Sequence, residues 1–277
     1  MGNRGTKKKF TMIMNNDLHN PIKEPKKHNK DRQLDIENGL LPKILAYPPE
    51  LQRQLVNYLS TFMTTRRNDL FRHIASQRTR YIKVVLEDIF QSHNASAVLR
   101  SCECFGIQDV HFIENKFHYE LNPDIALGSW KWLTLNRHAD AADNTTECLR
   151  NLKAQGYRIV ATSPHQQDTT PDKLALDKGK IALVFGTELN GLSEQAIAMA
   201  DEFVRIPMVG FTESFNISVS VALCIYQLTD RLRKSTLNWQ LEDDEITALL
   251  LDWMRNSIRM SKSLEKKFVE KNIFHAK

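Results

Sequence analysis

The chain has 277 residues, of which 42% are hydrophobic and 26% are charged, so it can bury a full core in one large domain with extensions. Its longest apolar runs, at residues 181–185 and 219–225, are far shorter than the roughly 18 to 20 residues that cross a bilayer, which excludes a transmembrane helix. The four cysteines lack C-x-x-C and zinc-finger spacing, and the Lys-rich start carries no apolar run of signal-peptide length. We therefore expect a cytoplasmic protein with reduced thiols, no metal and no membrane contact.

Charge is distributed unevenly along the chain. Residues 1–34 hold nine Lys/Arg against three Asp/Glu, residues 62–83 hold six against one, and residues 253–277 hold seven against two. The segment 84–252 holds fourteen against twenty-four. Basic extensions around an acidic centre suit a protein whose ends neutralise phosphates. Charge alone fits solvated tails equally well.

The first 80 residues predict a basic arm followed by a helical extension. Residues 1–40 are polar, rich in Lys and Asn and poor in periodic apolar residues, which indicates a disordered arm. In residues 41–80, apolar side chains recur at three- and four-residue spacing, which predicts two amphipathic helices broken near 64–68. We expect the exposed side of these helices to carry five arginines: Arg66, Arg67, Arg72, Arg78 and Arg80.

Short β-rich runs alternate with helical runs from residue 81 to about residue 235. Strands are expected at 81–86, 110–113, 130–135, 158–161, 180–185 and 203–206, and helices at 95–105, 141–155, 194–200 and 217–233. This alternation predicts an α/β domain with a mainly parallel sheet and helices on both faces. Residues 236–277 form a second helical extension, with one helix over 242–268 whose acidic start and basic end suit the helix dipole.

Two segments that follow expected strands could hold a ligand, because open parallel sheets bind ligands at the carboxyl ends of their strands. Residues 88–106 contain Asn94 and Arg100, six residues apart and under two turns along a helix. Residues 181–193 end a buried strand at Gly186 and continue into a second glycine, and such a loop can wrap a flat ligand such as adenosine. This loop lacks the G-x-G-x-x-G fingerprint, which disfavours a nicotinamide-dependent dehydrogenase.

A third segment, residues 206–220, places Ser214 and Asn216 at the start of a long helix. The polar groups and free N–H groups of that helix end could hold a ligand. Each of the three segments also has an ordinary interpretation, in which Asn94, Ser214 and Asn216 are helix caps and Arg100 is a solvated helix residue.

Taken in this order and with these intervals, the three segments resemble the three motifs of the SpoU/TrmH family in the SPOUT superfamily. The resemblance covers about residues 80–235. The stretch Gly128-Ser-Trp-Lys-Trp132 is similar to a Gly-Ser-x-Lys-Trp stretch in the branch of the family that acts on transfer RNA. Two positions depart from the family pattern, with Phe215 where leucine is usual and Ser220 where alanine is usual.

The resemblance implies S-adenosylmethionine as cofactor and 2′-O-methylation of the D-loop guanosine at position 18 of transfer RNA. It also implies a C-terminal trefoil knot and an obligate homodimer. The cofactor would lie in the knot loops, held by five residues: Thr162, Gly186, Ile206, Met208 and Phe215. No metal is needed, because the sulfonium already activates the leaving group.

The family gives the motif-one arginine, here Arg100, the central catalytic role. A guanidinium with a pKa above ~12 is a poor base, so we interpret Arg100 as a cation that binds a phosphate and lowers the pKa of the ribose hydroxyl. The resemblance implies that Asn94 orients Arg100 or the ribose. Loop ordering or substrate contact falls to four residues: Glu188, Asn190, Ser214 and Asn216. The RNA backbone would be gripped by basic residues of both extensions: Arg66, Arg67, Arg72, Arg78, Arg80, Lys262, Lys266 and Lys267.

Two other functions stay open at this level. A 2′-O-methyltransferase acting on ribosomal RNA would share every catalytic residue, although its relatives usually add an N-terminal α/β domain for which residues 41–80 are too short. A non-catalytic RNA-binding relative would be expected to lose Arg100 or the polar residues of the third segment, and this sequence retains both.

Overall fold

The computed structural model describes residues 47–118, 128–163 and 169–274, with the backbone alone for 272–274. The arm predicted for residues 1–40 lies outside this part of the chain. The strands are β1 Ile82–Glu87, β2 Asp109–Ile113, β3 Thr134–His138, β4 Arg158–Thr162, β5 Ile181–Phe185 and β6 Glu202–Val204. The helices are α2 Pro49–Ser60, α3 Thr65–Ser76, α4 Ser92–Phe105, the 3₁₀ helix η2 Ser129–Trp132, α6 Asn144–Ala154, α7 Glu194–Met199, α8 Ile217–Lys234, α9 Asp243–Ser257 and α10 Ser261–Phe274.

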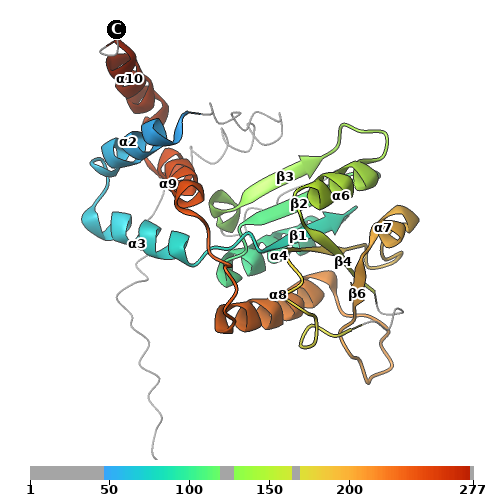
Figure 1. The fold of residues 1–277 in the computed structure, drawn as a ribbon. Helices are drawn as coiled ribbons and strands as arrows, with labels where there is room; N and C mark the ends of the chain where they lie inside the picture. The colour runs from blue at the N-terminus through green and yellow to red at the C-terminus, as the bar shows by residue number, and fades with distance from the viewer. Residues whose placement is uncertain (1–46, 119–127, 164–168, 275–277) are drawn as a thin grey trace, which may run out of the picture. The chain divides into compact units, whose positions relative to one another are not determined.

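The six strands form one sheet in the order β3-β2-β1-β5-β4-β6, and all neighbouring strands in it are parallel. Every residue of the central strands β1 and β5 is buried, as expected when both faces of a sheet are covered. Helices α6 and α7 pack on one face through Leu149, Leu152 and Ala196, and α4 and α8 pack against each other on the other face (Figure 1). The predicted α/β fold with a mainly parallel sheet is confirmed.

Two predicted elements differ from those observed. The segment 130–135 is not a strand from its start, because Gly128 adopts a left-handed conformation that opens the 3₁₀ helix η2, and β3 begins only at Thr134. The single helix expected over 242–268 is two helices. Met260, whose φ of 65° lies outside the right-handed helical region, interrupts the helix between α9 and α10.

The extensions at the two ends of the folded part pack against each other, with α2 and α3 against α9 and α2 against α10 (Figure 1). The rings of Tyr58 and Phe268 stack with centroids 4.7 Å apart, and Phe71 meets Trp253 edge to face at 5.7 Å. Helix α2 ends at Ser60 and α3 begins at Thr65, capped by the Thr64 hydroxyl, so the break between the two N-terminal helices lies at residues 61–64 and reaches only the first residue of the predicted 64–68. Segments from opposite ends of the sequence therefore form one helical layer.

Two of the five arginines expected on the exposed side of the N-terminal helices lie at the junction with the α/β domain. Arg78 is 1% exposed and pairs with Glu103 at 2.8 Å, and burial lowers the pKa of its guanidinium. Arg80 pairs with Asp109 at 3.2 Å and Glu245 at 2.9 Å. The prediction of an exposed Arg78 is wrong, because its guanidinium is used inside the protein to fix α4.

The described helices include none that is long and apolar enough to span a membrane. Within the described ranges all four cysteines are free, and three of them are buried: Cys102, Cys148 and Cys224.

Candidate functional site

The end of β4 with Ser163 and the loops that follow β5 and β6 surround one cavity of about 320 Å³, closed on one side by the start of α8. Their meeting follows from the sheet order, since β5, β4 and β6 are neighbours and parallel, so their carboxyl ends share an edge. All five residues predicted to hold the cofactor line this cavity: Thr162, Gly186, Ile206, Met208 and Phe215.

The loop after β5 folds back on itself at its glycines. Thr187 and Gly191 exchange two backbone hydrogen bonds, of 2.9 and 3.0 Å. A Cβ placed on Gly186 would lie 2.1 Å from the carbonyl oxygen of Gly191, so only glycine fits here. The two glycines noted in the sequence thus shape the cavity wall by close backbone approach.

A buried carboxylate that the sequence analysis did not single out anchors the other end of this loop. Glu87, 2% exposed at the end of β1, accepts hydrogen bonds from the Ser193 amide at 2.8 Å and from the hydroxyls of Ser193 at 2.7 Å and Thr145 at 2.5 Å. The signal was present in the sequence, since Glu87 is an acidic residue that directly follows the apolar run Val84-Val-Leu86 at the end of its strand. Its role is to position the loop that carries Glu188.

Three predicted site residues from separate motifs meet in one hydrogen-bond network. A single carboxylate oxygen of Glu188 accepts from the amide nitrogens of Asn94 at 2.9 Å and Asn216 at 2.7 Å, and from the backbone N–H of Ile217 at 3.3 Å. Asn216 also donates to the amide oxygen of Asn94 at 3.0 Å. The Glu188 network therefore ties the starts of α4 and α8 to the loop after β5.

The remaining predicted residues lie apart from this network. Ser214 and Asn190 are exposed and line the cavity. Arg100 lies on the exposed side of α4, outside the cavity lining. Its side chain forms no hydrogen bond or ion pair within the described ranges. Six residues of helix carry it ~9 Å along the axis from Asn94.

The cavity fits the predicted cofactor in size and chemistry. Its volume lies in the ordinary range for small-ligand sites, ~300–1,000 Å³. Apolar walls from Phe185, Leu192 and Ile206 suit an adenine ring, and the Glu188 carboxylate supplies negative charge at the rim for a cationic ligand. Phe215, one of the two departures from the family pattern, lines the cavity and is 41% exposed.

Comparison with known proteins assigns the chain to a family. The model of the SpoU rRNA methylase family matches residues 81–226, more than half of the chain. The chain therefore belongs to the SpoU methylase family, as its three motifs indicated. SpoU methyltransferases use S-adenosylmethionine, so the predicted enzyme class and cofactor are confirmed.

Two curated relatives share most of their length with this chain. A tRNA (guanosine(18)-2′-O)-methyltransferase of Borreliella burgdorferi is 42% identical over 76% of this chain and 94% of its own. The Thermus thermophilus protein of the same name is 30% identical over 69% and 97%. Among solved structures, the A. aeolicus TrmH/SpoU tRNA modifying enzyme matches with a TM-score of 0.62 at 26% identity, covering 70% of this chain and 98% of that one.

The Glu188 network predicts a graded response to substitution. We expect Glu188→Ala to lower kcat/KM by about 10- to 100-fold, because three donors lose their acceptor. Glu188→Gln keeps an acceptor oxygen and should lose clearly less. Steady-state methyl-transfer kinetics measure both, with Glu194→Ala, an exposed glutamate on α7, as the matched control. Wild-type kinetics in Glu188→Ala would show that the network is dispensable.

Proposed function

We propose that this protein transfers a methyl group from S-adenosylmethionine to the 2′-hydroxyl of guanosine 18 in transfer RNA. The main support for this proposal is that one residue from each motif meets the others at the rim of the cavity that fits the cofactor: Asn94, Glu188 and Asn216. The names of the two curated relatives supply the substrate. We place the enzyme in the cytoplasm, where its substrate is.

The reaction would be an in-line displacement in which the ribose oxygen bonds to the methyl carbon as the sulfur–methyl bond breaks, the cofactor would leave as the neutral thioether, and the hydroxyl proton would pass to solvent. The bound cofactor supplies a methyl group already activated by its sulfonium. The protein's tasks are therefore alignment and a more acidic ribose hydroxyl. The cavity fixes one reactant, and the Glu188 network holds its rim in place. Arg100, as a permanent cation, binds a phosphate beside the ribose and stabilises the developing oxyanion.

Methyl transfer from labelled S-adenosylmethionine to unmodified transfer-RNA transcripts tests this function. The modified ribose is mapped, and a transcript with 2′-deoxyguanosine at position 18 serves as the matched control because it lacks only the acceptor oxygen. We expect label at position 18 and none in the deoxy transcript. Transfer only to ribosomal RNA would keep the chemistry and reject the substrate, and transfer to neither would reject the function.

We also propose a homodimer and a knotted chain. An exposed apolar stripe on α8 supports the dimer: Val219, Leu223 and Tyr226 lie at helical spacing and are 44%, 41% and 56% exposed. The knot is proposed for the loops around the cavity, where the sheet order places β6 beside β4 although β5 lies between them in sequence. The mass of the protein in solution, measured by light scattering, tests the dimer.

Basic side chains of the helical layer are proposed to hold the RNA backbone. Arg66, Arg72 and Lys262 are exposed on α3 and α10, and Arg67 is half-buried beside Phe71. Lys266 and Lys267 are exposed on α10 as well, with Lys266 at 3.8 Å from Glu270. This placement gathers basic residues of the segments 62–83 and 253–277 on one set of packed helices.

Single substitutions in this layer should change the salt dependence of transfer-RNA binding. We expect Arg72→Ala and Lys267→Ala each to flatten the slope of log K for RNA binding against log[salt] by about 1. Each should also weaken binding equally for RNAs of different sequence. Filter binding across a salt series measures the slope. Lys173→Ala, an exposed lysine of the α/β domain, is the control. Unchanged slopes in both layer variants would place the RNA elsewhere.

A further inference from the structure

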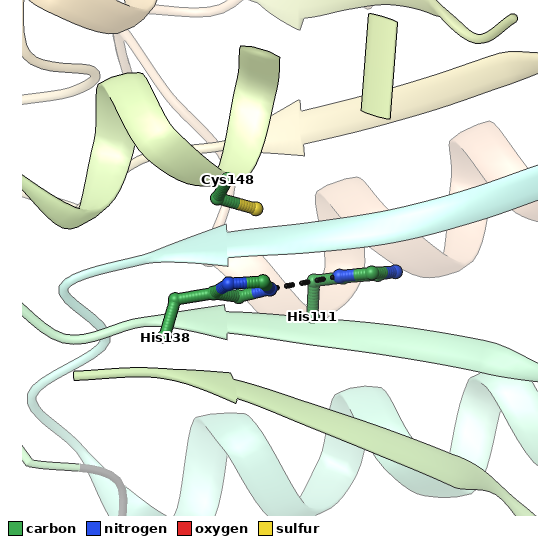
Figure 2. Close-up of side chains that lie close together, drawn as sticks. All are labelled: His111, His138 and Cys148. Carbon is green, nitrogen blue, oxygen red and sulfur yellow. Dashed lines mark hydrogen bonds between the residues drawn. The ribbon is translucent and has the colours of Figure 1, made fainter. Parts of the chain in front are cut away.

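Two histidines and a cysteine, distant in sequence, meet on the face of the sheet that α6 covers. His111 on β2 and His138 on β3 are hydrogen-bonded, with His111 Nδ1 3.0 Å from His138 Nε2, and their ring planes are inclined by 12° with the centroids 5.3 Å apart. Cys148 extends from α6 toward these rings (Figure 2). One ligand atom from each residue lies within 4.8 Å of the other two. We call these residues the His-His-Cys cluster.

The position of the cluster follows from strand register. His138 pairs directly with Ile113, and His111 lies two residues before Ile113 on the same strand, so all three side chains share one face of the sheet. His111 is 5% exposed, Cys148 is fully buried, and His138 is half-buried at the end of its strand. A small ion could thus enter past His138, while the other two ligands are held by the core.

We propose that the His-His-Cys cluster binds a zinc-like cation that clamps α6 to β2 and β3. Two imidazoles and a thiolate are the donor set that Zn²⁺ prefers, and a water at the open side would complete four-fold coordination. At ordinary Zn–N and Zn–S lengths and tetrahedral angles, the nitrogens would lie about 3.4 Å apart and the sulfur about 3.6 Å from each. In the structure the two nitrogens are hydrogen-bonded at 3.0 Å and the ligand atoms lie within 4.8 Å of one another, so metal binding requires the imidazoles to turn out of this hydrogen bond and the Cys148 side chain to move toward them.

Protonation also suits metal binding. Burial lowers the pKa of His111 to about 3 and also lowers that of His138, so both rings are neutral at pH 7 and each has one nitrogen without a proton. The hydrogen bond between the two rings uses one of these lone pairs, and a bound metal would replace that hydrogen bond. Burial raises the pKa of the Cys148 thiol to about 12, so zinc must displace one proton from it to solvent. The charged groups that face the cluster are one ammonium and three carboxylates: Lys83, Glu87, Glu114 and Glu147.

The proposed site is separate from the methyl-transfer machinery, so its test does not depend on turnover. The full chain is reduced, stripped with a chelator, loaded with Zn²⁺ or Co²⁺ and passed through a desalting column. We expect one metal per chain by mass spectrometry, about one proton released per zinc, and a thiolate-to-cobalt charge-transfer band. We also expect affinity to rise about tenfold per pH unit.

Two substitutions of equally buried thiols provide the matched comparison. Cys148→Ala removes a proposed ligand, whereas Cys102→Ala removes a thiol from α4 outside the cluster. We expect Cys102→Ala to keep the metal and the cobalt band, and Cys148→Ala to lose the band and at least about 100-fold in affinity. If Cys148→Ala does not fold, His138→Asn at the half-buried position makes the same test. A wild-type chain that retains no zinc, or ligand variants with unchanged stoichiometry and spectrum, would overturn the proposal.

Discussion

Arg100→Ala is expected to lower kcat by at least about 100- to 1,000-fold while leaving the Kd for S-adenosylmethionine within about twofold of wild type. The first effect follows from loss of a positioned cation that stabilises charge developing on the ribose oxygen. The second follows from the structure, because Arg100 projects from the exposed side of α4 and does not line the cavity. Single-turnover methyl transfer and equilibrium cofactor binding measure the two quantities separately.

Two further variants make this prediction specific to the guanidinium. Arg100→Lys keeps the positive charge but loses the two-pronged hydrogen bonding of the guanidinium. If this variant recovers part of the kcat lost in Arg100→Ala, charge is what matters; if it recovers none, the geometry of phosphate binding is what matters. Arg150→Ala removes an exposed arginine from α6 and should leave kcat unchanged. Weaker cofactor binding with normal turnover at saturation in Arg100→Ala would contradict the assignment.

The architecture could be predicted from the sequence wherever the hydrophobic periodicity and the residues at the element boundaries indicate the same element. The six strands and the helices between them occur in the expected order, and the boundary errors arise where a local conformation overrides composition. Trp130 and Trp132 suggested a strand, but both belong to η2, and Trp132 packs against Trp253 from the far end of the chain. Such a contact between segments about 120 residues apart leaves no periodic signal.

The candidate site, too, could be predicted only in part. The resemblance selected five residues that line one cavity, yet burial could not be read from residue type, and so Arg78 was expected at the surface although it lies inside. Glu87 was overlooked because its partners, Thr145 and Ser193, come from other elements. The His-His-Cys cluster escaped for that reason too, since strand register and helix packing, not sequence spacing, bring its members together.

Gly186→Ala should damage both stability and cofactor binding. The added methyl group would lie 2.1 Å from the carbonyl oxygen of Gly191 and 2.4 Å from the backbone nitrogen of Leu192, so backbone must move. The loop cannot shift freely, because Thr187 pairs with Gly191 at one end and Glu87 holds Ser193 at the other. We expect a loss of about 1–3 kcal/mol in the free energy of unfolding and at least about tenfold weaker binding of S-adenosylmethionine.

Gly210→Ala is the control that separates a close backbone approach from the general effect of replacing glycine. A Cβ at Gly210 would meet its nearest atom only at 4.0 Å, and neither Gly186 nor Gly210 has a positive φ that would strain alanine. Denaturant unfolding and cofactor titration should therefore show Gly210→Ala near wild type. Equal losses in the two variants would mean that the loop after β5 is not rigid, and the close approach at Gly186 would then not be what shapes the cavity.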